Sequence, residues 1–298
     1  MTAALAGAGR KREQSLIDGE FPLTKGDYQQ ITGIAYADAG IDLGESKASL
    51  VYSRLAKRLR TLQLNDFRSY CEYLASDAGG EERQQMVAAL TTNVTRFFRE
   101  PHHFEHLRAH VIPQLAARAR AGAPVRIWSA ACSSGEEPYS IALSILSVIP
   151  DAANLNVRVL ATDIDPNVLR KGSAGVYSES VMEAVPKDIR HRWFVPHDDA
   201  REGKSWRAGE ELRRMVAFRK LNLIGQWPMR GPFQAIFCRN ALIYFKEQTQ
   251  VDIWRRFVPL MAPGARLYIG HSERVFGEAA PFFVNEAITT YRLKEATA

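Results

Sequence analysis

The chain has 298 residues, of which 46% are hydrophobic and 24% charged, which is typical of a soluble globular protein with a sizeable core. No stretch is long and apolar enough to cross a bilayer, and the first charges follow the N-terminal small residues, opposite to the order in a secretory signal. We therefore expect a cytoplasmic protein without membrane insertion. Its formal net charge of +6 favours an acidic partner.

Three cysteines, Cys71, Cys132 and Cys238, are spread along the chain. They are too few and too scattered for a disulfide framework, and no C-x-x-C pair indicates zinc or redox chemistry. We expect reduced, packed thiols.

The N-terminal third predicts a tail followed by a small helical domain. Residues 1–20 are rich in small and basic residues without apolar periodicity, which predicts a mobile tail. Residues 21–90 have a helical period in four segments, separated by turns that contain Gly or Asp. We expect an all-helical domain there.

A basic cluster lies on the second of these segments. Residues 47–60 contain no acid and five basic residues, Lys47, Arg54, Lys57, Arg58 and Arg60, beside an apolar stripe of Val51, Leu55, Leu59 and Leu62. A solvated cationic face explains the cluster, and so does a docking surface for an acidic partner. Because the sequence has no DNA-binding motif, we expect no nucleic acid.

Three histidines, His102, His106 and His110, fall four residues apart after Pro101 and predict one helical face. No carboxylate or cysteine pattern completes a metal shell around them. We predict an exposed helix face and no metal.

From about residue 120, short β-rich runs alternate with helical stretches. The runs are VRIWSA (125–130), VRVLATD (157–163), FQAIFC (233–238) and ARLYIGH (265–271). This alternation predicts a doubly wound α/β domain, which we place at residues 91–298. Residues 193–221 lack a clear helical period and predict an inserted antiparallel β-subdomain.

The stretch SAACSSGEEPYS, beginning at Ser129, follows the first of these strands and leads into a helix. It contains one glycine, Gly135, where a dinucleotide fingerprint has three, and Glu136 and Glu137 stand at the helix entrance. Two carboxylates there repel a pyrophosphate, but they suit S-adenosylmethionine, which has an amino acid and a sulfonium and no phosphate. A helix start with favourable carboxylates is the alternative explanation.

Polar residues also end the next strands. Asp163 stands where nucleotide-binding sheets place the acid that binds ribose hydroxyls, although a loop-capping acid explains it too. Asp165, before Pro166, is expected to cap the following helix. Arg239 and Asn240 end the third strand, where they either face the cleft or form a solvated turn.

Five motifs, TTNVTRFFREPHHF, WSAACSSGEEPYSIA, ATDIDPNVL, FCRNALIYF and GHSE, together resemble the CheR-type chemotaxis receptor methyltransferases of bacteria. The resemblance runs from about Tyr28 to the C-terminus. It implies a helical N-terminal domain, a Rossmann-like catalytic domain and a small inserted β-subdomain. It also implies methyl transfer from S-adenosylmethionine to glutamate side chains of chemoreceptors, with S-adenosylhomocysteine as product.

The resemblance also implies roles for individual residues. Arg99 and Tyr244 would face the acceptor glutamate, unless Tyr244 is a core aromatic of the next helix. Asn93 and Thr95 would contact the cofactor, unless one of them caps an interdomain segment. The full set of implied cofactor contacts is Asn93, Thr95, Arg99, Gly135, Glu136, Glu137, Asp163, Asn222, Leu223, Arg239 and Asn240.

Partners follow from the same resemblance. Receptors of this kind present glutamates on an acidic helical surface, which Arg54, Lys57 and Arg58 would engage. In some members the β-subdomain also binds a short tether peptide at the receptor's C-terminus by strand addition. We expect a monomer.

Overall fold

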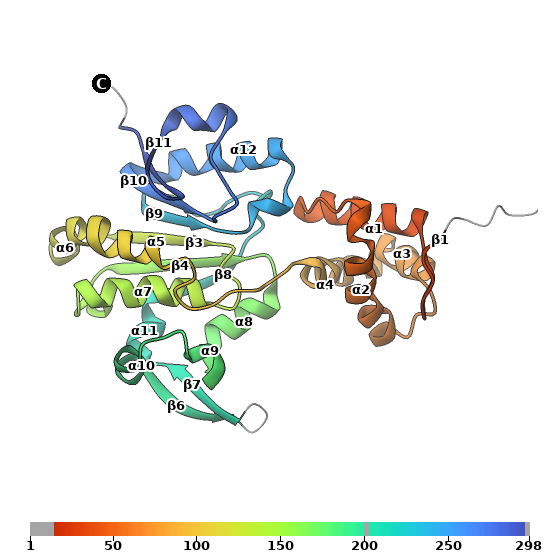
Figure 1. The fold of residues 1–298 in the computed structure, drawn as a ribbon, viewed down its shortest axis with the longest axis horizontal. Coiled ribbons are helices and arrows are strands. Elements are labelled where there is room, and N and C mark those ends of the chain that lie inside the picture. The colour runs from red at the N-terminus through yellow and green to blue at the C-terminus, as the bar shows by residue number, and fades with distance from the viewer. Residues whose placement is uncertain (1–14, 200–202, 296–298) are drawn as a thin grey trace, which may run out of the picture. The chain divides into compact units, whose positions relative to one another are not determined.

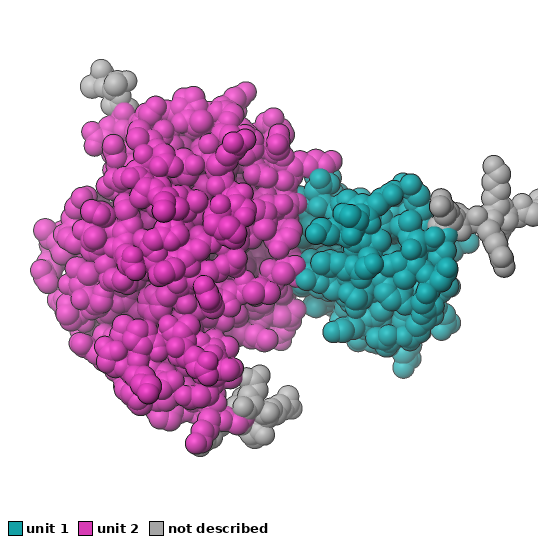
Figure 2. All heavy atoms as spheres, in the orientation of Figure 1, with its two compact units in different colours: residues 1–90 teal, residues 91–298 magenta. Residues whose placement is uncertain are grey.

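The computed structural model describes residues 15–199 and 203–295. The chain divides into two compact units, Met1–Leu90 and Thr91–Ala298, which are coloured separately in Figure 2. The predicted tail falls mostly outside the described residues. Its last part is not a tail, because Ser15–Ile17 forms strand β1 and pairs antiparallel with β2, Leu23–Thr24.

Unit 1 is helical, as the fold prediction required. Its helices are α1 (Lys25–Ala39), α2 (Ala48–Leu62), α3 (Phe67–Ala75) and α4 (Gly80–Leu90), with 3₁₀ turns at Glu45–Lys47 and Asp77–Gly79. Thr24 and Asp27 form a capping box at the start of α1. Gly40 ends that helix in the left-handed region at φ 73°. Local sequence therefore sets both ends of α1.

The apolar stripe of α2 forms part of the unit 1 core. Val51, Leu55 and Leu59 are fully buried, but Leu62 is only half-buried, so the predicted stripe ends one turn early. Lys47 precedes the helix rather than lying on it.

Unit 2 is built on a seven-stranded sheet in the order β11-β12-β10-β9-β3-β4-β8. Strands β10, β9, β3, β4 and β8 run parallel, and β12 pairs antiparallel with β10 and β11. The strands are β3 (Val125–Ala130), β4 (Val157–Asp163), β8 (Val216–Lys220), β9 (Phe233–Cys238), β10 (Met261–Ile269), β11 (Phe283–Ala287) and β12 (Thr290–Leu293). The sheet is therefore mixed at one end and parallel elsewhere.

Helices cover both faces of this sheet (Figure 1). Ile127 of β3 packs into the core with α6 and α7, whereas its neighbour Trp128 packs into the opposite core with α12. The helical segments are α5 (Pro101–His106), a π-helical turn (Leu107–Val111), α6 (Ile112–Arg120), α7 (Glu136–Val148), α8 (Pro166–Ala174) and α12 (Glu247–Phe257), with 3₁₀ turns at Ala152–Asn154, Leu242–Tyr244, Val258–Leu260 and Gly277–Phe282. This is the doubly wound α/β arrangement that the sequence predicted.

The inserted β-subdomain starts earlier and ends earlier than predicted. Its three-stranded antiparallel sheet, in the order β5-β7-β6, consists of β5 (Val176–Ser178), β6 (Phe194–Asp199) and β7 (Gly203–Ala208). It also contains α9 (Glu179–Met182) and α10 (Lys187–Trp193), and α11 (Glu210–Met215) follows it. The boundaries 193–221 are wrong, because Val216–Lys220 is the parallel strand β8 of the main sheet.

The insertion closes on itself at its base. The backbone N–H of Ala208, where the subdomain ends, donates to the carbonyl of Gly175, where it begins, at 2.8 Å. Tyr177 anchors the base in the main core, where its ring packs edge-on against Phe97 and Tyr139.

Two further observations concern the cysteines and the helices. Cys71, Cys132 and Cys238 are buried free thiols. Across residues 15–199 and 203–295, no helix has both the length and the apolar character needed to cross a membrane.

Candidate functional site

Most of the predicted cofactor residues lie where the parallel strands end at their carboxyl edge, or in the loops that follow. Asp163 ends β4, Arg239 follows β9, and Gly135 closes the loop after β3. Because parallel strands end at a common edge, these side chains gather at one end of the sheet.

The loop after β3 is tightly folded. Ala131, Ser133 and Gly135 all have positive φ, at 62°, 50° and 99°. A Cβ at Gly135 would lie 2.8 Å from the hydroxyl of Tyr177 and 2.9 Å from Cα of Gly172, so this position requires glycine. Left-handed conformations at two non-glycine residues store strain, a feature that clusters at functional sites.

Asp163 is buried, and both its carboxylate oxygens accept hydrogen bonds from backbone N–H groups. One oxygen accepts from N–H of Ser133 at 2.8 Å and the other from N–H of Asp165 at 3.0 Å. Burial raises the pKa of Asp163, and the N–H donors oppose that rise. The loop-capping explanation is therefore correct, and the remaining lone pairs leave the carboxylate able to accept hydroxyl groups as well.

Asn93 connects the segment before α5 to this edge. Its side-chain amide donates to Asp165 at 2.9 Å, and its backbone carbonyl accepts from the hydroxyl of Ser133 at 3.0 Å. Asp165 also caps α8 through N–H of Asn167, as predicted. Asn93 is not a helix cap, because the residue before α5 is Glu100.

The two glutamates at the start of α7 have different surroundings. Glu136 accepts from the hydroxyl of Ser134 at 2.7 Å. Glu137 accepts from Ser129 at 2.7 Å and from Nη1 of Arg239 at 3.2 Å. Burial raises the pKa of both carboxyls, and Arg239 opposes the rise at Glu137.

Arg239 joins three segments in the site. Beyond Glu137, its guanidinium donates to the backbone carbonyl of Arg99 and lies 3.6 Å from Oε2 of Glu100. It is only 6% exposed, so the solvated-turn alternative is wrong for this residue. Asn240 adopts φ 57°, and its buried Oδ1 has no hydrogen-bond partner within the described part of the chain.

The remaining predicted residues lie in loops. Arg99 is half-buried and donates to the carbonyl of Val94 at 3.0 Å, and Thr95 of the same segment is also half-buried. Tyr244 ends the short 3₁₀ turn Leu242–Tyr244 and is half-buried, so it is not a core aromatic of α12. Asn222 and Leu223 follow β8, with Oδ1 of Asn222 accepting from N–H of Ile224.

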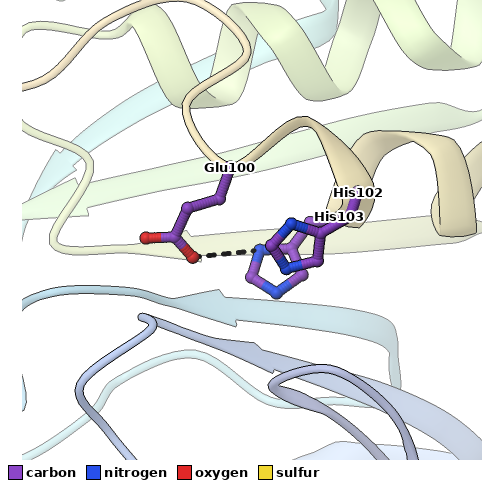
Figure 3. Close-up of side chains that lie close together, drawn as sticks. All are labelled: Glu100, His102 and His103. Atoms are coloured by element: carbon purple, nitrogen blue, oxygen red, sulfur yellow. Dashed lines mark ion pairs between the residues drawn. The ribbon is translucent and has the colours of Figure 1, made fainter.

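The structure does not bring all three histidines of the predicted face together. Instead, Glu100, His102 and His103 offer ligand atoms within 4.8 Å of one another, with Nδ1 of His103 3.7 Å from Oε2 of Glu100 (Figure 3). The guanidinium of Arg239 is 3.6 Å from that same oxygen, which disfavours a second cation. Burial lowers the pKa of His103 to about 2, so its ring is neutral. The absence of a metal stays a prediction.

His106 and His110 lie next to each other, with ring centroids 4.8 Å apart. His106 is half-buried and its Nδ1 lies 3.0 Å from the hydroxyl of Tyr268. The prediction of an exposed face is therefore wrong at His106 and at the half-buried His102, whereas His110 is exposed. His103, which was not part of that prediction, is fully buried.

In unit 1, the predicted docking residues are partly engaged within the unit. Arg54 donates to the carbonyls of Ala89 and Leu90 at the end of α4. Arg58 forms two hydrogen bonds to Glu82, at 2.9 and 2.5 Å. Lys57 is exposed. The alternative explanation, a simple solvated face, is therefore wrong for Arg54 and Arg58, and receptor binding by these residues stays a prediction.

Both units match one family. The description "CheR methyltransferase, all-alpha domain" covers residues 26–91, and "CheR methyltransferase, SAM binding domain" covers residues 93–291. The chain belongs to the CheR methyltransferase family. The predicted resemblance is thereby confirmed, as is the fold class.

Several curated relatives share nearly their whole length with this CheR-family chain. A "Probable chemotaxis protein methyltransferase" of Rhizobium etli is 54% identical over 86% of the chain and 96% of its own length. "Chemotaxis protein methyltransferase 2" of Pseudomonas aeruginosa is 44% identical, over 85% and 88% respectively. The "Chemotaxis protein methyltransferase" of Escherichia coli is 41% identical over 92% of both chains.

The cofactor of this CheR-family enzyme is S-adenosylmethionine, as predicted. The residues at the sheet edge fit it. Oδ1 of Asn240 and Nε of Arg239 are buried atoms without partners among the described residues. Three buried carboxylates, those of Glu136, Asp163 and Asp165, stand at the adjoining strand and helix ends. Such a set can bind hydroxyl and amino groups, and it contains no lysine for a phosphate.

Several residues of this site escaped the sequence analysis. Ser129 and Ser133 hold the acids, Glu100 contacts Arg239, and Glu273 accepts backbone hydrogen bonds from the loop after β9. Glu273 ends the motif GHSE, which contributed to the resemblance without indicating a role. Only that motif signalled it.

Proposed function

We propose that this protein transfers the methyl group of S-adenosylmethionine to glutamate side chains of bacterial chemoreceptors, giving glutamyl methyl esters and S-adenosylhomocysteine. The observation that carries the proposal is the match across both units to relatives named chemotaxis protein methyltransferases. A relative that shared only the cofactor-binding unit would support methyl transfer alone. The matching helical unit supports the same class of acceptor.

In this proposal, different sheet-edge residues bind different parts of the cofactor. Asp163 accepts hydrogen bonds from the ribose hydroxyls. Glu136 or Glu137 holds the amino-acid end, and Arg99 binds its carboxylate. The other proposed contacts are Asn93, Thr95 and Gly135 around the loops, Asn222 and Leu223 beside the adenine, and Arg239 and Asn240 at the floor of the cleft.

The acceptor needs orientation rather than deprotonation. When bound, S-adenosylmethionine supplies an electrophilic methyl group on a positively charged sulfur. A glutamate with an ordinary pKa of about 4.3 is already ionised at neutral pH, so no general base is required. Arg99 and Tyr244 orient its carboxylate for in-line attack, which is where the rate enhancement arises.

Unit 1 contributes the docking surface in this proposal. Lys57 is exposed, whereas Arg58 is largely neutralised by Glu82 and Arg54 holds the end of α4. The attraction for an acidic receptor surface therefore depends on Lys57 more than on the two arginines. It accelerates encounter and weakens with salt.

The β-subdomain is the proposed site for a receptor tether peptide. Strands β5 and β6 are the outer strands of its sheet, in the order β5-β7-β6. An outer strand offers backbone groups to an added strand. Extension of this sheet by an extended peptide accounts for the predicted tether.

The test uses methyl-labelled S-adenosylmethionine with chemoreceptor-containing membranes, followed by mild alkali and counting of volatile methanol. Methyl esters release methanol under alkali, whereas N-methyl groups and ethers do not. We expect receptor-dependent, alkali-labile label. Asp163→Asn should lower the affinity for S-adenosylhomocysteine about tenfold or more, because a charged acceptor of hydrogen bonds is lost. Asp188→Asn, at an exposed position of α10, is the control.

Alkali-stable label would retain methyl transfer and overturn the glutamate acceptor. Receptor-independent label would point to a small-molecule acceptor. Cofactor binding without any label would point to a regulatory module. Unchanged cofactor affinity in Asp163→Asn would remove Asp163 from the site.

A further inference from the structure

The carboxylate of Glu273 collects four backbone N–H groups. Oε2 accepts from Gly270 at 2.6 Å and Asn240 at 2.9 Å, and Oε1 accepts from Leu242 at 2.8 Å and Ala241 at 3.1 Å. Glu273 is 7% exposed. A single side chain therefore satisfies three consecutive donors of the loop after β9.

Those three donors stand between the residues assigned to the reaction. Arg239 precedes them, Asn240 is the first of them, and Tyr244 ends the 3₁₀ turn that starts at Leu242. The first N–H groups of a helical turn have no partner within that turn. Here an acid from a distant part of the chain supplies the partner, and its negative charge favours the positive end of the turn.

The loop carrying Glu273 also packs directly on Asn240. Gly270 follows β10, which is paired with β9 so that Ile269 lies opposite Cys238. A Cβ at Gly270 would lie 2.7 Å from the backbone nitrogen of Asn240 and 2.3 Å from its side-chain amide. Two strand ends are therefore locked together, by contact at Gly270 and by hydrogen bonds at Glu273.

The loop is thus held by two independent sets of contacts. Glu273 fixes its backbone, while Glu137, Glu100 and the carbonyl of Arg99 hold the side chain of Arg239. Asn240 keeps its left-handed conformation between these two sets of contacts, and its Oδ1 has no partner within residues 15–199 and 203–295. Functional side chains act best when a supporting layer fixes their geometry.

We propose that Glu273 is a positioning residue: its buried carboxylate fixes the backbone of residues 240–242 and so aims Arg239 and Asn240 at the cofactor and Tyr244 at the acceptor. The inference rests on the proposed function for the roles of those three residues. Glu273 itself touches neither cofactor nor acceptor.

The test compares Glu273→Gln with the intact enzyme. Glutamine has nearly the same shape, but its amide N–H₂ would face donors, so at least one pair of backbone N–H groups loses its acceptor. We expect amide exchange in residues 239–244 to accelerate at least tenfold. We also expect at least a fivefold loss of affinity for S-adenosylhomocysteine, or a similar fall in kcat at saturating cofactor.

Two controls separate positioning from general loss of stability. Glu278→Gln removes a 73% exposed carboxylate that pairs with Arg255, and it should change none of these quantities. Leu212→Ala opens a cavity in the other core and costs about 2–5 kcal/mol. At a temperature where all variants are folded, Leu212→Ala should have the same amide exchange rates at residues 239–244 as the intact enzyme. Its affinity for S-adenosylhomocysteine and its kcat should also be unchanged.

Gly270→Ala provides a second route if Glu273→Gln does not fold. It leaves the carboxylate in place but pushes the loop of residues 270–273 against Asn240, and it should produce the same pattern. Unchanged exchange at residues 239–244 overturns the proposal, as does faster exchange with normal affinity and normal kcat. Exchange and S-adenosylhomocysteine binding require no acceptor, so they decide the role of Glu273 even if receptor methylation is not observed.

Discussion

The sheet edge of unit 2 and the α2 face of unit 1 handle charge in opposite ways. At the sheet edge, Glu136 and Asp163 are buried and Glu137 is half-buried, and burial raises the pKa of all three. Arg239 is the guanidinium that pairs with one of these acids. On α2, Arg58 pairs with Glu82, and Arg60 pairs with Glu20.

This difference separates charges that support folding from charges kept for a ligand. A buried carboxylate without a full counter-charge costs stability, so such a cluster at a strand edge indicates a binding role. Arg58 and Arg60, whose carboxylate partners belong to the same helical unit and lie far from the sheet edge in sequence, are explained by the fold itself. Sequence alone could not make this distinction, because a partner distant along the chain leaves no local pattern.

The largest expected effect tests the paired charges on α2 of unit 1. Arg58→Ala should destabilise unit 1 by about 2–4 kcal/mol, because Glu82, 3% exposed, loses its counter-charge while remaining buried. Urea unfolding followed by far-UV circular dichroism would measure it. All five tryptophans lie in unit 2, so the tryptophan fluorescence transition should stay unchanged.

Arg68→Ala is the matched control for that experiment. Its pair with Glu72 is exposed, with side chains 70% and 68% accessible, and its removal should change little. Equal stability of Arg58→Ala and Arg68→Ala would show that Arg58 is a surface charge after all, and the contrast between the two regions would fail.

An effect of intermediate size is expected at the sheet edge of unit 2, where the buried carboxylate of Glu136 is assigned to ligand binding. The raised pKa of Glu136 means that its ionisation costs stability once the pH exceeds its ordinary value of 4.5, with the full cost above the raised pKa. Glu136→Gln should therefore raise Tm at pH 8, and the gain should shrink as the pH falls toward 4. The same variant should bind S-adenosylhomocysteine more weakly, since stability and function trade against each other here.

Calorimetric scans at pH 8, 6 and 4 would follow the Tm of Glu136→Gln. Glu211→Gln serves as its control, because Glu211 is an exposed residue in the first turn of α11. A lower Tm for Glu136→Gln at every pH would mean that the carboxylate stabilises the fold, contrary to its assignment as a ligand charge.

The smallest effect concerns the docking surface. Lys57→Ala should lower kcat/KM for receptor methylation about two- to threefold at low salt, without changing stability. The loss should disappear near 0.5 M salt, where charges are screened. Lys294→Ala, at an exposed position of unit 2, should have no such effect. A loss that persists at high salt would argue against steering by Lys57.

The sequence predicted the architecture well where strands are buried on both sides. Val125–Ala130, Val157–Asp163 and Phe233–Cys238 have the predicted bounds because each is a short run rich in apolar residues and almost wholly buried. Val216–Lys220 was assigned to the insertion because it lies at the sheet edge, where two of its five residues are exposed and the apolar run is short. The three-residue strand β5 was too short to give a period.

The sequence indicates the charged residues of the candidate site. It does not indicate the side chains that hold those residues in place. Asp163 and Arg239 stand out after apolar strands, whereas Glu273 acts through backbone N–H groups, which every residue carries. Serines such as Ser129 and Ser133 are common in loops and gave no signal. Ala131 has a positive φ that its residue type does not predict, whereas Asn240 is of a type that adopts the left-handed region more readily.

The closed base of the inserted subdomain has a consequence for divergence within the family. Because Gly175 and Ala208 are hydrogen-bonded neighbours, the outer hairpin of β6 and β7 can lengthen, shorten or be exchanged without moving any strand of the main sheet. Tyr177 limits that freedom at the base, since its hydroxyl donates to the carbonyl of Ser134 in the cofactor loop. We therefore expect recombination to replace the outer hairpin readily without disturbing the cofactor loop.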